Sequence, residues 1–544
     1  MSFAAARALA VNAHSVGVLQ RAGLINLLAP ADTARAARLV RQWGPIAGPV
    51  RMSALREPDR VAVIDELGSL TYRELDERSN ALARGFAAQG IGPGSTVGSL
   101  VRDRRELVDT MLAAAKAGAR LVLLNTGFAG PQLADVAVRE GVNVVVYDQE
   151  FADLMTVLPP QVWRVLAMHD SAGDLPTVAG LIAGHSPAEL PPPASQGGFV
   201  LLTGGTTGTP KGVPRQVRSP LAAAGLLERI PLRRNQTLVL AAPLFHGTAL
   251  NQFLMALSLA STVVLRRRFD AEATLAAVAE QRAAVLVLVP TMLRRILELG
   301  PQTLGRYDFS SLTVIFSAGS ALPAALGDAA TEVFGEVLYN FYGSTEVGVA
   351  TIATPADWRA APGTVGKPPT MCTVRLYDDH GALVTEPGQR GTVYCRSLLS
   401  FTGYSGGGNK KSIDGLLSSG DVGHWDAGGR LFIDGRDDDM IVSGGENVFP
   451  GEIEELLYAH PDIAEAAIIA VPDDEFGQRL AAFVVLQPDA ALDGNAVRAY
   501  VKANLARFKV PRDVSFVDAL PRTSTGKLLR RDLTGEPAAP GASH

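Results

Sequence analysis

The sequence predicts an α/β protein with a large N-terminal domain and a smaller α+β C-terminal domain. The large domain contains mixed, mostly parallel sheets flanked by helices and ends in a small β subdomain. Through the first two thirds of the chain, short apolar runs alternate with helical patterns, which is typical of parallel strands covered by helices. After about residue 365 the predicted strands come at short intervals with turn signals between them, which favours antiparallel pairing. The 544 residues are enough for several domains.

The predicted elements begin with a hairpin. Residues 60–65 and 69–72 form two strand patterns that turn at Gly68, and residues 73–89 form a helical pattern that stops at Gly90. Further β-rich runs alternate with helical stretches, one of which covers about residues 104–117. These runs lie at 96–101, 120–125, 143–148, 238–245, 262–267, 284–290 and 312–319.

Changes of character along the chain predict its domain boundaries. The proline-rich, polar segment 185–198 is the clearest linker, and a second change falls near residues 435–440. Beyond it, an acidic helix pattern, two strands, another helix and a basic tail form a compact unit. We therefore expect a helical extension (1–50), a large domain (51–436, with its β subdomain at about 365–436) and a C-terminal domain (437–544).

The composition excludes several classes of function. The formal net charge of −5 is nearly neutral for this length, so the chain as a whole offers no field for nucleic acid. The apolar share of 47% and charged share of 19% are those of an ordinary folded protein. Only two cysteines are present, Cys372 and Cys395, which favours a reducing compartment and gives no zinc motif.

Two stretches have some of the character of membrane segments. Arg7 and later polar residues interrupt the apolar N-terminus, which predicts a peripheral amphipathic cap, with a removed signal peptide as the alternative. Residues 247–265 are uncharged but barely reach the ~18–20 residues of a membrane span, so we expect a buried helix followed by a core strand. The expected location is cytoplasmic, and peripheral association with the inner face of the membrane stays open.

Residues 203–212, TGGTTGTPKG, follow an apolar strand pattern and have the composition of a phosphate-binding loop. Glycines let backbone N–H groups converge on an anion, four threonines add hydroxyls, and Lys211 adds a positive charge. A Walker loop continues with Ser or Thr after its lysine, whereas Pro210 and Gly212 flank Lys211 here. The loop predicts a phosphate site whose magnesium ligand comes from elsewhere, and a flexible surface turn is the alternative.

Further motifs follow in order along the chain: PLFHG (243–247), SAGSALP (317–323), YGSTE (342–346), SSGDVG (418–423), IDGR (433–436) and PRTSTGK (521–527). Together with TGGTTGTPKG they resemble the signatures of the adenylate-forming (AMP-binding) superfamily, which includes acyl-CoA synthetases, luciferases and the adenylation domains of peptide synthetases. The resemblance spans about residue 55 to the end. It implies that the C-terminal domain is mobile and rotates between two half-reactions.

The nucleotide site combines residue chemistry with this resemblance. Tyr342 offers an aromatic face for adenine, and Glu346 offers the hard oxygen that Mg²⁺ prefers, although a glutamate at a helix N-terminus is the alternative. The resemblance implies that Asp421 and Arg436 contact the ribose. The implied ATP/AMP site comprises Thr203, Gly204, Gly205, Thr206, Thr207, Gly208, Lys211, Ala318, Gly319, Ser320, Tyr342, Gly343, Ser344, Thr345, Asp421, Ile433, Arg436 and Lys527, with Thr206 and Glu346 at the metal.

The resemblance also implies the remaining roles. Lys527, Lys211 and Glu346 are the implied catalytic residues, and Asp438 is the implied hinge between domains. The implied acyl pocket comprises Phe245, His246, Gly247 and Gly343, with His246 as a wall or gate. The implied path of CoA runs past Gly444, Gly445, Glu446 and Asn447.

The implied reaction joins a carboxylate to the α-phosphorus of ATP and then passes the acyl group to a thiol. The run 437–457 looks most like fatty-acyl-CoA ligases, so we expect a medium- or long-chain fatty acid, ATP, Mg²⁺ and coenzyme A. The alternatives are an acyl-AMP ligase that serves a carrier protein, an aryl-CoA ligase, and a silent nucleotide-binding regulatory protein. We expect no nucleic-acid partner, and a homodimer stays open. Gly204 departs from the family, which usually has Ser or Thr there.

Overall fold

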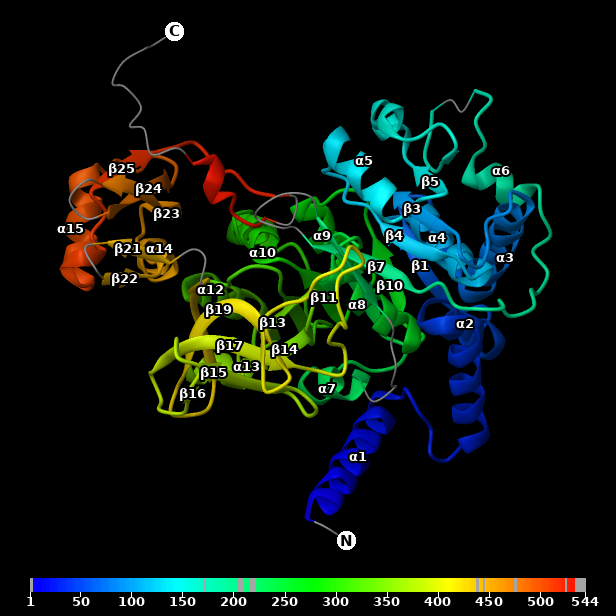
Figure 1. The fold of residues 1–544 in the computed structure, drawn as a ribbon, viewed down its shortest axis with the longest axis horizontal. Helices are drawn as coiled ribbons and strands as arrows, with labels where there is room; N and C mark the ends of the chain where they lie inside the picture. The colour runs from blue at the N-terminus through cyan, green and yellow to red at the C-terminus, as the bar shows by residue number, and fades with distance from the viewer. Residues whose placement is uncertain are drawn as a thin grey trace.

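The computed structural model describes residues 3–170, 173–203, 210–215, 222–436, 440–443, 446–473, 477–523 and 526–533. Figure 1 shows a large body that carries the central sheets, with the C-terminal domain at one side and two N-terminal helices projecting below it. The predicted fold class, with mostly parallel sheets in a large domain and a separate sheet in a smaller C-terminal domain, is confirmed. The domain boundaries at residues 50/51 and 436/437 remain our proposal.

The central sheet of the large domain has eight strands in the order β14-β13-β12-β11-β9-β10-β1-β2. Only its two outer pairs, β1–β2 and β13–β14, are antiparallel. Its inner strands are runs of buried Val, Leu and Ile, as expected for a sheet covered on both faces. The strands are β1 (Val61–Asp65), β2 (Gly68–Thr71), β9 (Thr237–Leu240), β10 (Thr262–Leu265), β11 (Val285–Leu288), β12 (Val314–Ser317), β13 (Leu338–Ser344) and β14 (Gly348–Ala353).

A second sheet of six strands lies beside it in the order β6-β5-β3-β4-β7-β8 and is parallel except for the β7–β8 hairpin. Its strands are β3 (Thr96–Leu100), β4 (Arg120–Leu123), β5 (Val144–Tyr147), β6 (Trp163–Leu166), β7 (Phe199–Thr203) and β8 (Lys211–Arg215). Helices of the large domain are α3 (Tyr72–Ala88), α4 (Arg105–Ala117), α5 (Gly130–Arg139), α6 (Val178–Ala183), α7 (Ala222–Arg229), α8 (Gly247–Ser258), α9 (Ala271–Glu280), α10 (Pro290–Leu297), α11 (Gly300–Leu304), α12 (Ala324–Phe334) and α13 (Pro355–Ala360).

Several predicted elements are confirmed. The first hairpin is β1–β2, and the helix after it, α3, ends before Gly90, which has a φ of 73°. The uncharged stretch 247–265 is the buried helix α8 followed by the core strand β10. Among the described residues, no helix is both long and apolar enough to cross a membrane.

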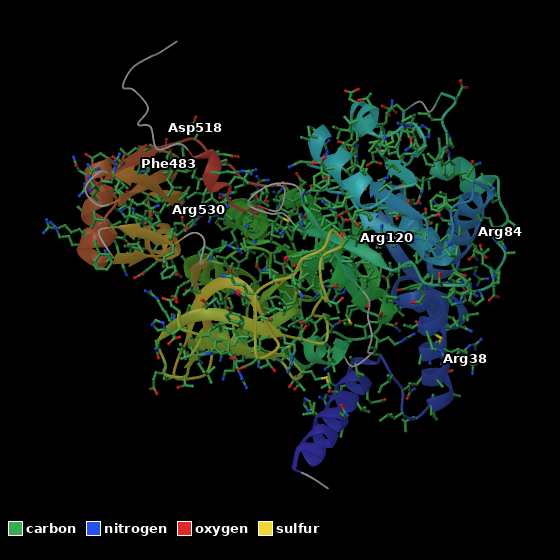
Figure 2. The ribbon with its side chains drawn as sticks, in the orientation of Figure 1. Arg38, Arg84, Arg120, Phe483, Asp518 and Arg530 are labelled. Carbon is green, nitrogen blue, oxygen red and sulfur yellow. The ribbon has the colours of Figure 1, made fainter. Side chains whose placement is uncertain are left out.

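The predicted linker 185–198 contains no helix or strand and lies against α3. Arg84 of α3 donates hydrogen bonds to the carbonyls of Ser186, Ala188 and Glu189, and Asn80 donates one to Pro187 (Arg84 is labelled in Figure 2). The segment therefore connects α6 to β7 within one sheet and is fixed to the domain surface.

The β subdomain and the C-terminal domain are built on antiparallel pairs. In the subdomain, β19 pairs with β17, β18 and β20, and β15 pairs with β16 and β17. In the C-terminal domain, β24 pairs with β23 antiparallel and with β25 parallel, beside the small β21–β22 ribbon. The elements are β15 (Thr373–Tyr377), β16 (Leu383–Val384), β17 (Arg390–Arg396), β18 (Ser412–Ile413), β19 (Leu416–Trp425), β20 (Leu431–Arg436), β21 (Ile441–Ser443), β22 (Glu446–Val448), α14 (Pro450–Tyr458), β23 (Ile463–Asp473), β24 (Gly477–Leu486), α15 (Gly494–Asn504) and β25 (Asp513–Phe516).

Two helices precede the first hairpin, α1 (Phe3–Ala22) and α2 (Pro30–Arg56). Gly44 has a φ of 77° and breaks α2 into two parts. The part after Gly44 is largely buried, whereas most residues of the part before it are exposed. Only the second part of α2 is therefore integrated into the core of the large domain.

Candidate active site

The predicted phosphate loop is the tip of the β7–β8 hairpin. Thr203 ends β7 and pairs in register with Lys211, which begins β8 as a strand residue. The side chain of Lys211 is exposed, and its Nζ lies 5.0 Å from the centroid of the Tyr404 ring. The predicted ligands at the tip lie outside the described residues: Gly204, Gly205, Thr206, Thr207 and Gly208.

Tyr404 links two of the predicted catalytic residues. Its hydroxyl donates a hydrogen bond of 2.8 Å to Oε1 of Glu346, and the carbonyl of Glu346 accepts one of 2.7 Å from the Phe401 N–H. Glu346 is buried, and burial together with its carboxylate raises the pKa of Tyr404. The neighbouring Ser405 donates from its N–H to the carbonyl of Gly212. The segment after β17 therefore joins Lys211 and Glu346 in one cluster.

The β13–β14 hairpin sets the place of Glu346. Gly343 lies in this hairpin so close to the opposite strand that a Cβ atom would come within 2.0 Å of the Gly348 carbonyl oxygen. Ser344 accepts a hydrogen bond of 3.3 Å from the Val347 N–H, and Thr345 is the residue before Glu346. Because glycine alone fits at position 343, the turn that carries Glu346 is tightly defined.

Tyr342, Asp421 and Arg436 form a second cluster, which joins the central sheet to the β subdomain. The Tyr342 hydroxyl donates a hydrogen bond of 2.5 Å to Oδ2 of Asp421, and Nη1 of Arg436 lies 3.6 Å from Oδ1. Asp421 and Arg436 face each other in the β19–β20 register. Burial raises the pKa of Asp421, which the tyrosine and the arginine oppose.

This second cluster contains the predicted ribose residues. Ile433 of β20 is half-buried beside it, in the apolar cluster that also includes Tyr342. A Cβ atom at Gly420, which has a φ of 83°, would lie 3.1 Å from Nη2 of Arg436, so this glycine leaves room for the guanidinium. The structure thus brings Asp421 and Arg436 together, with a tyrosine that is suited to an adenosine nearby.

The loop of Lys527 lies against the carboxyl edge of the central sheet. Gly526 is buried, and a Cβ atom there would come within 2.2 Å of Oγ1 of Thr291, at the start of α10. Arg522 fixes the loop by donating a hydrogen bond of 2.7 Å to the Gly526 carbonyl while it pairs with Glu465 at 2.6 Å. The C-terminal domain therefore presents Lys527 directly beyond β11.

The predicted adenine turn lies next to this place. Ala318, Gly319 and Ser320 follow β12, which neighbours β11, and Gly319 has a φ of 98°. A Cβ atom at Gly319 would be 3.4 Å from Cγ1 of Val289, two residues before Thr291. The turn and the Lys527 loop thus both lie against the short segment 289–291.

The predicted acyl-pocket residues occupy the connection from β9 to α8. The rings of Phe245 and His246 lie 4.3 Å apart, and Gly247 begins α8 so close to β7 that a Cβ atom would be 3.2 Å from Cδ1 of Leu201. Burial lowers the pKa of His246 to about 3, so the imidazole is neutral at physiological pH. Within the described residues, its buried Nε2 has no hydrogen-bond partner.

Asp103, which follows β3, holds this connection. Both of its carboxylate oxygens accept from the Leu244 N–H, at 3.1 and 3.2 Å, and the residue is 7% exposed. Burial raises the pKa of Asp103 to about 7. No motif in the sequence pointed to Asp103 or Tyr404. An aromatic residue within the glycine-rich run 403–408 was the one available signal for Tyr404.

The described residues of the predicted CoA path lie apart from the Lys527 loop. Glu446 and Asn447 lie in β22, on the small ribbon of the C-terminal domain (Figure 1), whereas Gly526, the neighbour of Lys527, meets Thr291 at the start of α10. Gly444, Gly445 and the hinge residue Asp438 lie outside the described residues. In the described arrangement, β22 and the Lys527 loop therefore lie apart from each other.

Contacts between the C-terminal domain and the large domain fix this arrangement. Arg294 of α10 donates a hydrogen bond to the Ala464 carbonyl, and its guanidinium lies 4.6 Å from the Tyr458 ring centroid. At the start of α12, the Ala324 N–H donates to Glu455 at 3.4 Å. These contacts between the two domains are hydrogen bonds and one cation–π contact.

Comparison with known proteins identifies the family. Residues 50–405 match the AMP-binding enzyme family, and residues 452–527 match the AMP-binding enzyme C-terminal domain. The chain belongs to the AMP-binding enzymes. This AMP-binding enzyme is 33% identical over 500 residues to the indoleacetate–CoA ligase of Aromatoleum aromaticum, an alignment that covers 88% of this chain and 95% of the relative.

Two further relatives act on fatty acids. The fatty acid–[acyl-carrier-protein] ligase of Streptomyces coeruleorubidus is 30% identical and covers 88% of this AMP-binding enzyme and 94% of its own length. The long-chain-fatty-acid–CoA ligase of Mycobacterium tuberculosis is 30% identical, and the alignment covers 85% of this chain and 92% of the relative.

The solved structure of the o-succinylbenzoate CoA synthetase of Bacillus subtilis with its acyl-adenylate has a TM-score of 0.79 at 26% identity, covering 90% of this chain and 98% of that one. These comparisons support an AMP-forming acid–CoA ligase, for which ATP and CoA are the expected substrates.

Proposed function

We propose that this protein activates a medium- or long-chain fatty acid with ATP, giving acyl-AMP and pyrophosphate, and then transfers the acyl group to coenzyme A. The observation that carries the proposal is the contact of the Lys527 loop with the carboxyl edge of the central sheet, beside the turn 318–320. In this proposal, the contact brings Lys527 of the C-terminal domain close to the bound nucleotide, which supports its role in the reaction.

In the first half-reaction, a carboxylate oxygen attacks the α-phosphorus and pyrophosphate leaves. No protein nucleophile is needed, so the enzyme contributes position and charge neutralisation. Lys527 neutralises charge at the reacting carboxylate and α-phosphate, and Lys211 neutralises charge at the leaving pyrophosphate. Tyr342, Asp421 and Arg436 hold the adenosine.

Glu346 fits a magnesium ion because Mg²⁺ in nucleotide enzymes takes one or two carboxylates together with phosphate oxygens. Its carboxylate is buried beside the phosphate hairpin, and one oxygen already accepts from Tyr404. Thr206 is the second proposed ligand. A bound Mg²⁺ would neutralise phosphate charge and orient the pyrophosphate.

In the second half-reaction, the thiol of CoA attacks the acyl carbonyl carbon and AMP leaves. We propose that rotation about Asp438 removes Lys527 and brings Gly444, Gly445, Glu446 and Asn447 to the site. A chain segment that serves only one half-reaction is expected to lie away from the site in the arrangement that serves the other half-reaction. The separation of β22 from Lys527 is consistent with that scheme.

A second candidate substrate is an aromatic acid. It is favoured by the buried, unpartnered Nε2 of His246, which offers a hydrogen bond to a polar substituent, and by the similarity to an indoleacetate–CoA ligase. Delivery to a carrier protein instead of CoA is the further alternative, supported by the similarity to a fatty acid–[acyl-carrier-protein] ligase.

The test is the release of AMP and pyrophosphate by the purified protein with ATP, Mg²⁺ and a panel of saturated fatty acids and aryl acids, with and without CoA. Thioester formation with C8–C18 acids supports the proposal, and a clear preference for hydroxylated aryl acids supports the second candidate. AMP release without a thioester in the presence of CoA contradicts the CoA ligase. Absence of AMP release with every acid supports a silent regulatory protein.

A further inference from the structure

The first 56 residues have a charge opposite to that of the rest of the chain. They contain seven arginines, no lysine and one acidic residue, Asp32. The whole chain has 50 basic and 55 acidic residues, so residues 57–544 carry 43 basic and 54 acidic ones. Most of this basic segment precedes residue 50, where the match to the AMP-binding enzyme family begins. Such an asymmetry indicates an anionic surface as partner.

The turn between α1 and α2 holds two leucines in solvent. Leu27 is 58% exposed and Leu28 is 93% exposed. Their N–H groups donate to Oε1 of Gln20 at 2.7 Å and to Oδ1 of Asn26 at 3.0 Å, and the Asn26 N–H donates to Thr33 at 2.9 Å. Because side chains fix the turn from both helices, the exposure of the leucines is built into its fold.

Exposed arginines flank these leucines. Arg21 precedes the turn at the end of α1, and Arg35, Arg38 and Arg41 follow it along the first part of α2. At 3.6 residues per turn, the three arginines of α2 spread over about 120° of the helix surface. Within the described residues none of the four forms an ion pair, whereas Asp32 is neutralised by Arg56 at 2.5 Å.

The position of this segment leaves it accessible. Figure 1 shows α1 and the first part of α2 projecting from the same side of the molecule, and Figure 2 shows Arg38 on that projecting part. We propose that Arg21, the turn 23–29 and the first part of α2, residues 30–43, dock on an anionic membrane surface, with Leu27 and Leu28 inserted and the four arginines at the lipid headgroups. We call this the basic turn.

A membrane explains the combination better than a soluble anion. Paired exposed leucines gain nothing from a free phosphate, but they lose contact with water when they enter the interface. Arginines near an anionic surface add electrostatic attraction that falls off within a Debye length. Docking does not depend on the proposed ligase activity, since none of these residues belongs to the active site.

The test is co-sedimentation of the full chain with vesicles of phosphatidylcholine alone or with 30% phosphatidylserine, at ~0.1 M and ~1 M salt. We expect binding to the anionic vesicles only, and weaker binding at high salt. Glutamine substitutions should weaken vesicle binding by about fivefold for each arginine changed among Arg21, Arg35, Arg38 and Arg41. The double variant Leu27→Ser/Leu28→Ser should weaken vesicle binding by at least about tenfold.

Matched controls are available elsewhere on the surface. Leu67→Ser/Leu383→Ser removes leucines that are 63% and 50% exposed. Glutamine at Arg73, Arg268, Arg306 and Arg359 removes the same charge from arginines that pair with carboxylates. Neither control should change binding by more than about twofold, and circular dichroism checks that all variants are folded.

Three outcomes overturn the proposal. The first is no binding to anionic vesicles, and the second is an equal loss of binding in the control variants. The third is a dimer, seen by light scattering, that does not bind vesicles and that Leu27→Ser/Leu28→Ser abolishes. The last outcome assigns the basic turn to a second copy of the chain. Vesicle binding without ligase activity, or the reverse, separates this proposal from the proposed function.

Discussion

On the proposed nucleotide side of the active site the charged groups contact one another, whereas on the proposed acyl side buried polar groups lie among apolar side chains. Asp421 has Tyr342 and Arg436 as partners, and Glu346 has Tyr404. On the acyl side, Nε2 of His246 has no partner among the described residues, and Asp103 accepts hydrogen bonds only from backbone there.

This difference has a physical consequence. Groups that contact one another before ATP binds are already oriented, which lowers the entropic cost of binding. Such a fixed site suits ATP, which is the same whichever acid is activated. Polar groups that are buried without charged partners have pKa values shifted by burial, as His246 and Asp103 do. Substitutions on the nucleotide side should therefore change catalysis, and those on the acyl side should change stability and substrate choice.

The largest expected effect is at Lys527. Lys527→Ala should lower the rate of acyl-AMP formation by about 1000-fold, because it removes the cation at the reacting carboxylate and phosphate. Thioester formation from supplied acyl-AMP should be nearly unchanged. Lys502→Ala, at an exposed lysine of α15, is the control. Equal losses in both half-reactions would refute the two-arrangement scheme, and the measurement is single-turnover kinetics of each.

The next effect is at Asp421. Asp421→Asn should raise the KM for ATP by about 30-fold, because charged hydrogen bonds to the ribose and the ion pair with Arg436 are lost. The β subdomain contains a second tyrosine–aspartate–arginine cluster, in which Asp414 accepts from Tyr377 at 2.8 Å and from Arg375 at 3.5 Å. Asp414→Asn is thus a matched control with no expected change in KM. Similar KM shifts for both variants would remove Asp421 from the ribose site.

On the acyl side, Asp103 predicts a pH dependence of stability. Its folded pKa of about 7 is above the ordinary value of 3.8, so its contribution to stability is present below pH ~4 and is lost as the pH rises through about 7. The free energy of unfolding of Asp103→Asn relative to the original protein should therefore increase between pH 5 and 8, by about 1–2 kcal/mol after relaxation.

Urea unfolding at several pH values measures this difference. Asp308→Asn, at an exposed acid whose pKa is lowered by hydrogen bonds from Ser310, is the control and should give a difference that is constant between pH 5 and 8. A constant difference for Asp103→Asn as well would show that the carboxylate stays ionised throughout this range.

The smallest expected effect is at Tyr404. Tyr404→Phe removes the hydrogen bond to Glu346 but keeps the ring beside Lys211, so acyl-AMP formation should slow by about fivefold. Tyr307→Phe loses a hydrogen bond of 3.0 Å to Glu272, between two residues that are not part of the proposed site, and should leave the rate unchanged. A rate equal to that of the original enzyme in Tyr404→Phe would mean that ATP binding displaces this hydrogen bond at no cost.

Much of the fold follows from local patterns. The hairpin β1–β2, the helix α3 and the pair α8–β10 were predictable because turn glycines, a capping threonine and uninterrupted apolar runs act within a few residues. Residues 185–198 were different. Their prolines and polar residues indicate a linker, but their attachment to Arg84 depends on α3, about 100 residues away in the sequence.

For this protein, the sequence by itself determined the fold class and the family, and it proposed the charged residues of the site, because motifs are short and their chemistry is local. Only the tertiary structure decided which of these residues meet. The hydrogen bond from Tyr404 to Glu346 joins residues 58 apart, that from Leu244 to Asp103 joins residues 141 apart, and Gly526 meets Thr291 across two domains. Such contacts depend on how sheets and domains pack, which no local pattern encodes.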